Sequence, residues 1–295
     1  MIESVVLSDE VQAALGSGAP VVGLETTLVA HGFPAPEGVE VAHESEAAVR
    51  AVGAVPATIG VLDGAIRVGL RDEELSRFRP DARKVGPRDL AACVVQGAVG
   101  ATTVGGTLAV ARQAGIRFLG TGGLGGVHRG FPTPPDVSAD VPTLARSPTL
   151  VASSGVKSLL DVPATTEVLE TLGVPVIGFR TETLPLFYAA DGGPPVPIRV
   201  DEPDEAARIA AAHWELGGAG LLLVNPPPES IDVGDLVEEA LADARAQGVT
   251  GQAVTPFVLA ALHERSGGRT RAVNRRLVVA NARLAAEVAV AFGAL

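Results

Sequence analysis

Short apolar runs alternate with longer segments of helical periodicity, and this alternation restricts the fold more than any other feature of the chain. Apolar runs typical of buried strands lie at 21–25, 116–119, 149–153, 174–179 and 220–224. Segments with helical spacing lie at 37–51, 105–114, 203–217, 234–247 and 273–292. This pattern is typical of a parallel sheet covered by helices. We therefore expect an α/β fold.

A hairpin is predicted within 57–70, because Asp63-Gly64 offers the positive φ angles of a tight turn. The proline-rich segments 132–135, 194–197 and 226–228 are predicted to be loops or walls of a site. No internal repeat or low-complexity linker interrupts the sequence. We therefore expect a single domain spanning residues 1–295.

Composition excludes several classes of protein. The 295 residues are 47% hydrophobic, and the net charge of −11 argues against a nucleic-acid backbone or an anionic membrane as partner. One cysteine, Cys93, excludes a disulfide framework and a thiolate metal cluster. No apolar stretch approaches the roughly 18 residues of a membrane span, and the start MIESVVLSDEV does not read as a signal peptide. We expect a soluble, cytoplasmic protein.

Lysine is scarce in this chain. Of 23 basic residues only Lys84 and Lys157 are lysines, and the other 21 are arginines. Arginine stays protonated in proteins, whereas a desolvated lysine can lose its proton and act as a nucleophile. The two lysines are therefore candidates for chemistry, although they are also open to interpretation as ordinary surface residues.

Polar residues follow three of the expected strands, where open α/β sheets place their ligands. Glu25 ends the first strand, and burial there would raise its pKa and suit proton transfer, unless it only caps or anchors a turn. Lys157 follows the run TLVAS, where desolvation suits an amine nucleophile. The strand expected at 116–119 opens into a glycine-rich stretch, 120–130. This stretch predicts backbone amides turned toward a phosphate, with Thr121 and His128 as further donors.

Three features near these strands have competing interpretations. The spacing of Gly120, Gly122 and Gly125 fits a dinucleotide fingerprint, but the glycines and prolines up to residue 135 forbid the long helix that it requires. Asp136 and Asp140 flank a serine and suit a hard cation held largely through water, or a purely structural loop. Asparagines 274 and 281 share the apolar stripe of the last helix, where they either satisfy core backbone or face a site.

Nine motifs occur in an order that resembles the pseudouridine-5′-phosphate glycosidase family. They are GLETTLVAHGFP, ARKVGPRDL, GATTVGGT, TGGLGGVHRG, DVSAD, SSGVKSLLD, ETLGVPVIGFRTE, TPFVLAAL and LVVANARLAAE. The resemblance covers about residues 3–292, and the ordered set is far more specific than any one motif. Indigoidine synthase A-like proteins share the fold and much of the pattern.

The resemblance implies a lyase-type C-glycosidase (pseudouridylate synthase, hydro-lyase class) that reversibly cleaves the C–C glycosidic bond of pseudouridine 5′-phosphate to uracil and ribose 5-phosphate. It implies a three-layer α/β/α sandwich with a mostly parallel sheet, a homotrimer, and one largely water-coordinated Mn²⁺ per subunit. Lys157 matches the family's Schiff-base nucleophile at C1′, Glu25 its proton donor and Asp136 its metal ligand. Substrate-binding positions are matched by Lys84, Val104, Ser138, Ala139 and Asp140, and contacts to phosphate or sugar are expected from Thr121, His128 and Asn281.

The sequence departs from the family pattern at a few positions. Gly86-Pro87 stand where the family tends to have Ser-Arg, and Ala280 stands where it has a second asparagine, so substrate affinity is the property most affected. Two alternatives stay open: action on another phosphorylated pyrimidine C-glycoside, or sugar-phosphate binding without catalysis. A nicotinamide dehydrogenase is disfavoured by the prolines after the glycines.

Overall fold

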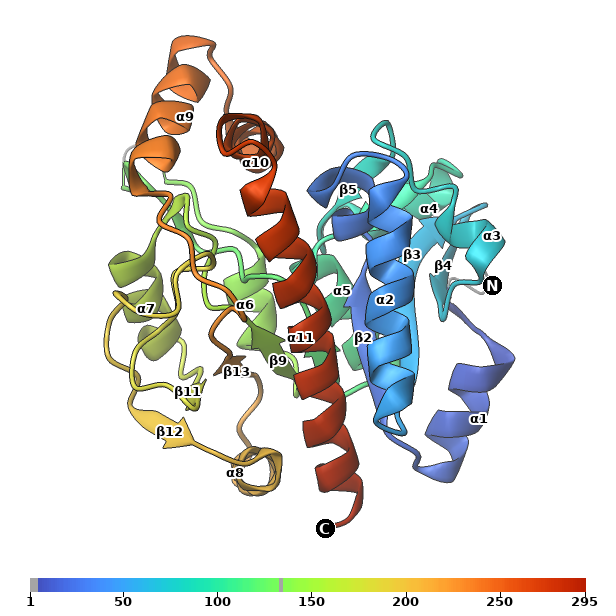
Figure 1. Cartoon of the computed structure of the whole chain (residues 1–295). Coiled ribbons are helices and arrows are strands. Elements are labelled where there is room, and N and C mark those ends of the chain that lie inside the picture. Colours follow the sequence, from blue (N-terminus) through green and yellow to red (C-terminus); the bar gives the residue numbers. More distant parts are fainter. Residues whose placement is uncertain (1–4, 133–134) are drawn as a thin grey trace.

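The chain folds around one long, mostly parallel sheet (Figure 1). The computed structural model describes residues 5–132 and 135–295, so the predicted loop at 132–135 lies partly outside the described residues. Parallel strands form the sheet from β3 to the β12 edge, in the order β3 (Val55–Leu62), β2 (Val21–Glu25), β7 (Phe118–Gly120), β9 (Leu150–Ser153), β13 (Leu221–Val224), β11 (Val176–Phe179) and β12 (Ile198–Val200).

The five predicted strands are confirmed. Strand β2 has the predicted bounds, and β7, β9, β11 and β13 begin one or two residues later than expected. Every residue of these five strands is buried. Strands of a parallel sheet are buried on both faces, so they are apolar along their length rather than alternating.

The amino-terminal side of the sheet mixes parallel and antiparallel pairs. The predicted hairpin joins β3 to β4 (Ala65–Val68) through Asp63 and Gly64, whose φ angles are 51° and 74°. Strand β1 (Val5–Leu7) pairs parallel with β4 at the edge. Strand β6 (Gly100–Thr102) pairs antiparallel with β3 and parallel with β5 (Arg83–Val85). Two short strands, β8 (Val127–His128) and β10 (Leu160–Asp161), pair separately.

Helices cover both faces of the sheet and complete an α/β/α sandwich (Figure 1). Leu221 and Leu223 of β13 pack in the cluster that includes α2 (Glu37–Ala51), α8 (Pro203–Glu215) and α11 (Arg269–Gly293). Leu222 and Val224 pack in the opposite cluster, which includes α5 (Val104–Ala114), α6 (Asp140–Leu144) and α7 (Val162–Thr171). The alternation of side chains along one strand thus reaches both helical layers.

The remaining helices lie around this frame. They are α1 (Asp9–Ser17), the π-helix η1 (Leu28–Gly32), α3 (Asp72–Leu75), α4 (Leu90–Val95), α9 (Gly234–Ala246), the 3₁₀ turn η2 (Gly251–Ala253) and α10 (Val254–Arg265). The five predicted helices are confirmed with ends shifted by at most four residues. The longer helices α1, α7 and α10 and the short helices α3, α4 and α6 were not predicted. Both α7 and α10 have proline in the first turn, and α7 is rich in β-branched residues, which lowers helix propensity.

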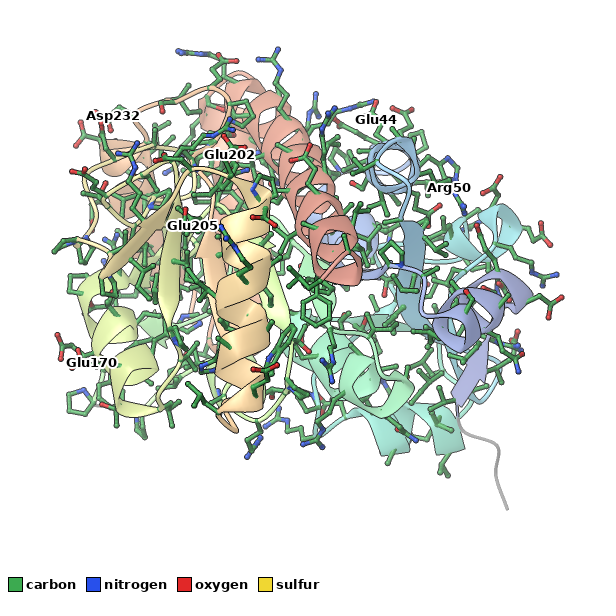
Figure 2. The ribbon with its side chains drawn as sticks, turned by 90° about the horizontal axis from the view of Figure 1, so that it is seen from below. Glu44, Arg50, Glu170, Glu202, Glu205 and Asp232 are labelled. Carbon is green, nitrogen blue, oxygen red and sulfur yellow. The ribbon has the colours of Figure 1, made fainter. Side chains whose placement is uncertain are left out.

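Many charged side chains lie at the outside of the molecule, whereas Glu25 and Asp140 are buried. Glu170 of α7 points outward at the edge of the molecule in Figure 2, and Glu170, Glu202 and Glu205 are all exposed. Within the described part of the chain, no helix combines the length and apolar character needed to cross a membrane.

Candidate active site

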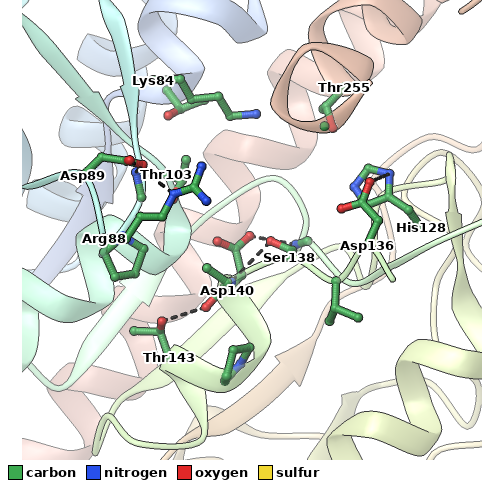
Figure 3. A pocket seen from close by; sticks show the side chains of 18 of the residues that line it. Lys84, Arg88, Asp89, Thr103, His128, Asp136, Ser138, Asp140, Thr143 and Thr255 are labelled. Atoms are coloured by element: carbon green, nitrogen blue, oxygen red, sulfur yellow. Dashed lines mark hydrogen bonds and ion pairs between the residues drawn. The ribbon is translucent and has the colours of Figure 1, made fainter. Parts of the chain in front are cut away.

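A pocket of about 680 Å³ lies where several segments meet at the carboxyl ends of the central strands. Its lining includes Glu25 from the end of β2, Lys84 of β5, Lys157 after β9, and the segment Asp136–Asp140. Figure 3 shows Lys84 at the top of this space, His128 with Asp136 at the right, and Asp140 below them. The predicted meeting of strand-end residues is therefore observed.

Glu25 is a buried carboxyl group at the wall of the pocket. It is the last residue of β2, its exposed fraction is 5%, and the Thr121 hydroxyl donates a hydrogen bond to its Oε1 over 2.5 Å. Burial raises the pKa of Glu25, and the positive charge of Lys157 opposes this shift. A carboxyl group that holds its proton at higher pH is suited to donate it to a substrate.

Both lysines of the chain reach the pocket. Lys157 is half-buried in the turn after β9, where its backbone amide donates to the Leu124 carbonyl over 3.1 Å. Burial lowers the pKa of Lys84 to about 8, and the charge of Lys157 contributes to this shift. Two primary amines in one pocket therefore lie within each other's electrostatic field.

The glycine-rich loop after β7 is more tightly packed than predicted. Its amides at Leu124, Gly125 and Val127 donate to Gly155, Asp140 and Thr165 of the protein itself. The prediction that the loop turns its amides toward a phosphate is therefore wrong for these three, because groups of the protein itself accept their hydrogen bonds.

Close packing explains the glycines of this loop. A Cβ at Gly126 would lie 2.3 Å from Thr165 Oγ1, and one at Gly123 would lie 2.5 Å from the Phe187 ring. The loop leads into β8 rather than into a helix, which confirms that it is no dinucleotide fingerprint.

Asp140 joins the loop to helix α5. Its Oδ1 accepts from the Gly105 amide over 2.7 Å, and its Oδ2 accepts from the Gly125 amide over 3.0 Å. The Ser138 hydroxyl accepts from the amide of Asp140 over 3.2 Å. Asp140 lines the pocket with Ser138 and Ala139, but both of its carboxylate oxygens already accept hydrogen bonds from the backbone. Its carboxylate is therefore first of all a structural bridge.

The residues matched to a metal and to phosphate form a looser group. His128 Nδ1 lies 3.8 Å from Asp136 Oδ2, and the Asp136 side chain is 40% exposed. Burial lowers the pKa of His128, and the Asp136 charge opposes this. No cluster of three or more His, Cys, Asp or Glu side chains suited to a metal occurs among residues 5–132 and 135–295. A cation here would thus have one carboxylate and water as ligands, which fits a hard, hydrated ion.

Three predicted binding residues lie behind the pocket surface. Val104, Thr121 and Asn281 are exposed by 1% or less. The Asn281 amide group donates to the Thr121 carbonyl over 2.8 Å and to Ser154 Oγ over 3.2 Å. Because protein groups already bind its carboxamide, Asn281 is not placed to contact phosphate or sugar as predicted.

Several pocket residues were not predicted. Arg88, Thr103, Arg146 and Thr255 line the pocket (Figure 3 labels the first two and Thr255). Arg88 and Thr255 belong to the motifs ARKVGPRDL and TPFVLAAL, which were the only signal available for them. Thr255 comes from the unpredicted helix α10, so its approach to Lys84 depends on tertiary structure.

Comparison with known proteins assigns the family. The model of the family described as indigoidine synthase A like protein matches residues 10–291. The pseudouridine-5′-phosphate glycosidase of Herpetosiphon aurantiacus is 48% identical over 294 residues, covering 97% of both chains. The enzyme of the same name from Salinispora tropica is 50% identical over 295 residues, covering 97% of this chain and 91% of its own. The chain belongs to the pseudouridine-5′-phosphate glycosidase family.

Two solved structures share the fold of this family member. The prealnumycin C-glycosynthase AlnA, in complex with ribulose 5-phosphate, is 40% identical with a TM-score of 0.90, and the match covers 100% of this chain and 98% of AlnA. An indigoidine synthase A-like protein from Thermotoga maritima is 38% identical with a TM-score of 0.89, covering 98% and 97%. Both likenesses confirm the α/β architecture over essentially the whole chain.

Proposed function

We propose that this chain is a pseudouridine-5′-phosphate glycosidase that reversibly cleaves the C1′–C5 bond between ribose 5-phosphate and uracil. The observation that carries the proposal is that Lys157 and the buried Glu25 line one pocket, in a chain whose relatives bear this name. The C-glycosynthase AlnA, with its bound ribulose 5-phosphate, supports chemistry of a C–C bond to a pentose phosphate in this fold.

A carbon leaving group explains the need for an amine. Carbon departs poorly from a sugar, so the pair of carboxylates that hydrolyses O-glycosides is insufficient. In our proposal Glu25 protonates the ring oxygen O4′ as the C1′–O4′ bond breaks, and the neutral amine of Lys157 bonds to C1′. The sugar is then open and attached to the enzyme through nitrogen.

Cleavage of the carbon–carbon bond follows from this attachment. The nitrogen lone pair forms a C1′=N double bond as the C1′–C5 bond breaks, and C5 of uracil takes a proton for which Glu25 is the shuttle. Water then adds to the imine, which releases ribose 5-phosphate and restores the amine of Lys157. The sum is substrate plus water giving uracil plus ribose 5-phosphate.

In this proposal Lys84 binds the substrate phosphate and Asp136 binds a metal ion. The positive charge of Lys84 attracts the substrate phosphate. Asp136 would hold the Mn²⁺ through its half-exposed carboxylate, with water completing the shell. When bound, such an ion supplies positive charge next to an anionic substrate. Homotrimeric assembly and a cytoplasmic location complete the proposal.

The test is direct. Purified protein is incubated with pseudouridine 5′-phosphate and Mn²⁺, with and without chelator, and free uracil is measured by chromatography. We expect metal-dependent release that is lost in Lys157→Ala and in Lys157→Arg, because the arginine keeps the charge but is no amine nucleophile. Absence of uracil from the wild type with every divalent metal tried would contradict the proposal.

A further inference from the structure

One carboxamide connects the loops that follow three adjacent strands of the sheet. Asn281 of α11 is fully buried, and its Nδ2 lies 2.8 Å from the Thr121 carbonyl and 3.3 Å from the Gly122 carbonyl after β7. The same Nδ2 lies 3.2 Å from Ser154 Oγ after β9. Its Oδ1 accepts from Asn225 Nδ2, after β13, over 3.0 Å. All of the polar atoms of this side chain are therefore engaged by strand-end loops.

Asn225, in the loop after β13, holds the Asn281 carboxamide through its oxygen atom. It follows β13 directly, and its backbone amide donates to the Ser153 carbonyl of β9 over 2.8 Å. Its side-chain amide meets the one atom of Asn281 that can accept a hydrogen bond. Asn225 therefore fixes which way the Asn281 carboxamide faces, with the NH₂ group toward the carbonyls.

The loops held by Asn281 carry the two proposed catalytic groups. Thr121, whose carbonyl binds Asn281, donates its hydroxyl to Glu25 Oε1. Ser154, whose hydroxyl binds Asn281, begins the turn that ends at Lys157, and its amide donates to the Gly122 carbonyl over 2.9 Å. One side chain thus connects the partner of the proton donor to the segment of the nucleophile.

Packing of α11 on the sheet brings the asparagine into reach. A Cβ at Gly120 of β7 would lie 2.7 Å from Cα of Ala282, so the helix backbone lies directly against the strand end. At this separation the short side chain of asparagine reaches the carbonyls of Thr121 and Gly122. An aspartate would place carboxylate oxygens against carbonyl oxygens, which is unfavourable in a buried position.

We infer that the Asn225–Asn281 pair is a positioning unit, which holds Glu25 at the correct distance from Lys157 by joining the loops after β7, β9 and β13. This inference rests on the proposed function. Neither asparagine needs to touch substrate, so losing one should slow the chemical step and leave substrate binding nearly unchanged.

The first experiment separates kcat from KM in Asn225→Ala, Asn281→Leu and the control Asn274→Leu. Asn274 lies on the same helix, is 1% exposed, and its carboxamide has no hydrogen-bond partner among the described residues. We expect kcat for pseudouridine 5′-phosphate to fall about tenfold in Asn225→Ala and further in Asn281→Leu, with KM within about twofold, because the lost hydrogen bonds position the reacting groups. The control should keep the wild-type kcat.

A second measurement keeps this inference separate from the proposed function. Ribose 5-phosphate is mixed with each variant and with borohydride, and the rate of adduct formation on Lys157 is followed by mass spectrometry. We expect slower trapping in both Asn225→Ala and Asn281→Leu and an unchanged rate in Asn274→Leu. If the wild type is trapped by ribose 5-phosphate but does not cleave pseudouridine 5′-phosphate, the proposed substrate is contradicted. The positioning role is then tested by the rate of adduct formation on Lys157 alone.

Two results would overturn the inference. One is a rise in KM at constant kcat, which would make Asn281 a ligand contact. The other is a kcat in Asn225→Ala equal to that of Asn274→Leu, at matched thermal stability. Since Asn225 is only half-buried, its alanine variant keeps the test valid even if Asn281→Leu fails to fold.

Discussion

Glu25 combines burial with an ionisable group, and this combination makes its behaviour depend on pH. Because burial raises its pKa, the folded chain binds the proton of Glu25 more tightly than the unfolded chain does. The free energy of unfolding therefore falls as pH rises from the unfolded pKa through the folded one. Glu25→Gln removes this ionisation, so we expect the variant to gain more stability over the wild type at pH 8 than at pH 4.

Thermal unfolding at pH 4 and pH 8 measures the difference in stability between Glu25→Gln and the wild type, and the assay for uracil measures the effect of the substitution on kcat. Glutamine cannot transfer a proton, so kcat should fall by about 10²- to 10⁴-fold. An equal stability difference at both pH values would show that Glu25 does not carry a raised pKa.

Lys84 gives a second pH-dependent prediction. Its pKa of about 8 means that its positive charge is present at pH 7 and largely lost at pH 9. If the charge attracts the substrate phosphate, KM should rise between these values in the wild type. In Lys84→Arg the cation persists, so KM should stay flat over this range.

Lys84→Met is the matched neutral variant, and its KM should be high at both pH values. The folded pKa lies below the unfolded one, so protonated Lys84 destabilises the fold below pH 8, and the methionine variant should be the more stable protein at pH 7. A wild-type KM that does not change between pH 7 and 9 would exclude this role for Lys84.

The chemistry of single residues was largely readable from the sequence, whereas their contacts were not. The scarcity of lysine and the position of Glu25 after an apolar run indicated the groups that line the pocket. Asn281 was placed among binding residues on the family resemblance, and its apolar stripe alone left a core role open. Three loops remote in sequence occupy its carboxamide. Such satisfaction of buried polar groups depends on tertiary packing, which no local pattern encodes.

At the scale of elements, Asp140 connects the start of α5 to the glycine-rich loop. Asp140→Ala leaves the amides of Gly105 and Gly125 without their acceptor, so we expect a loss of about 2–4 kcal/mol of unfolding free energy. Urea denaturation measures this loss. Asp136→Ala, in the same segment but half-exposed, should change stability by less than about 0.5 kcal/mol and serves as the control. Equal stability of the two variants would contradict the bridge.

Elements buried on both faces were the easiest to predict. Strands such as β9 and β13 are apolar throughout, and the hairpin is marked by Asp63-Gly64. Helix α10 was missed because its apolar residues surround it rather than forming one stripe, and proline lies in its first turn. The glycines after β7 were interpreted as an anion-binding loop, but contacts with Thr165 and Phe187 require them for reasons of space.

At the scale of the whole molecule, the proposed homotrimer predicts a mass in solution three times the 29.9 kDa of one chain. Light scattering coupled to gel filtration measures this mass without a standard. The measurement should be made in 0.15 M salt, because the net charge of −11 causes repulsion between chains at low ionic strength. A monomeric mass at micromolar concentration would contradict the trimer while leaving the pocket of one chain unchanged.

The central claim is that Lys157 forms the covalent bond to the sugar. The most direct measurement is borohydride reduction of the protein in the presence of ribose 5-phosphate, followed by digestion and mass spectrometry. We predict one reduced pentose phosphate adduct, located on Lys157, and no adduct in Lys157→Ala. An adduct on Lys84 instead, or uracil release from pseudouridine 5′-phosphate that persists in Lys157→Ala, would contradict the account.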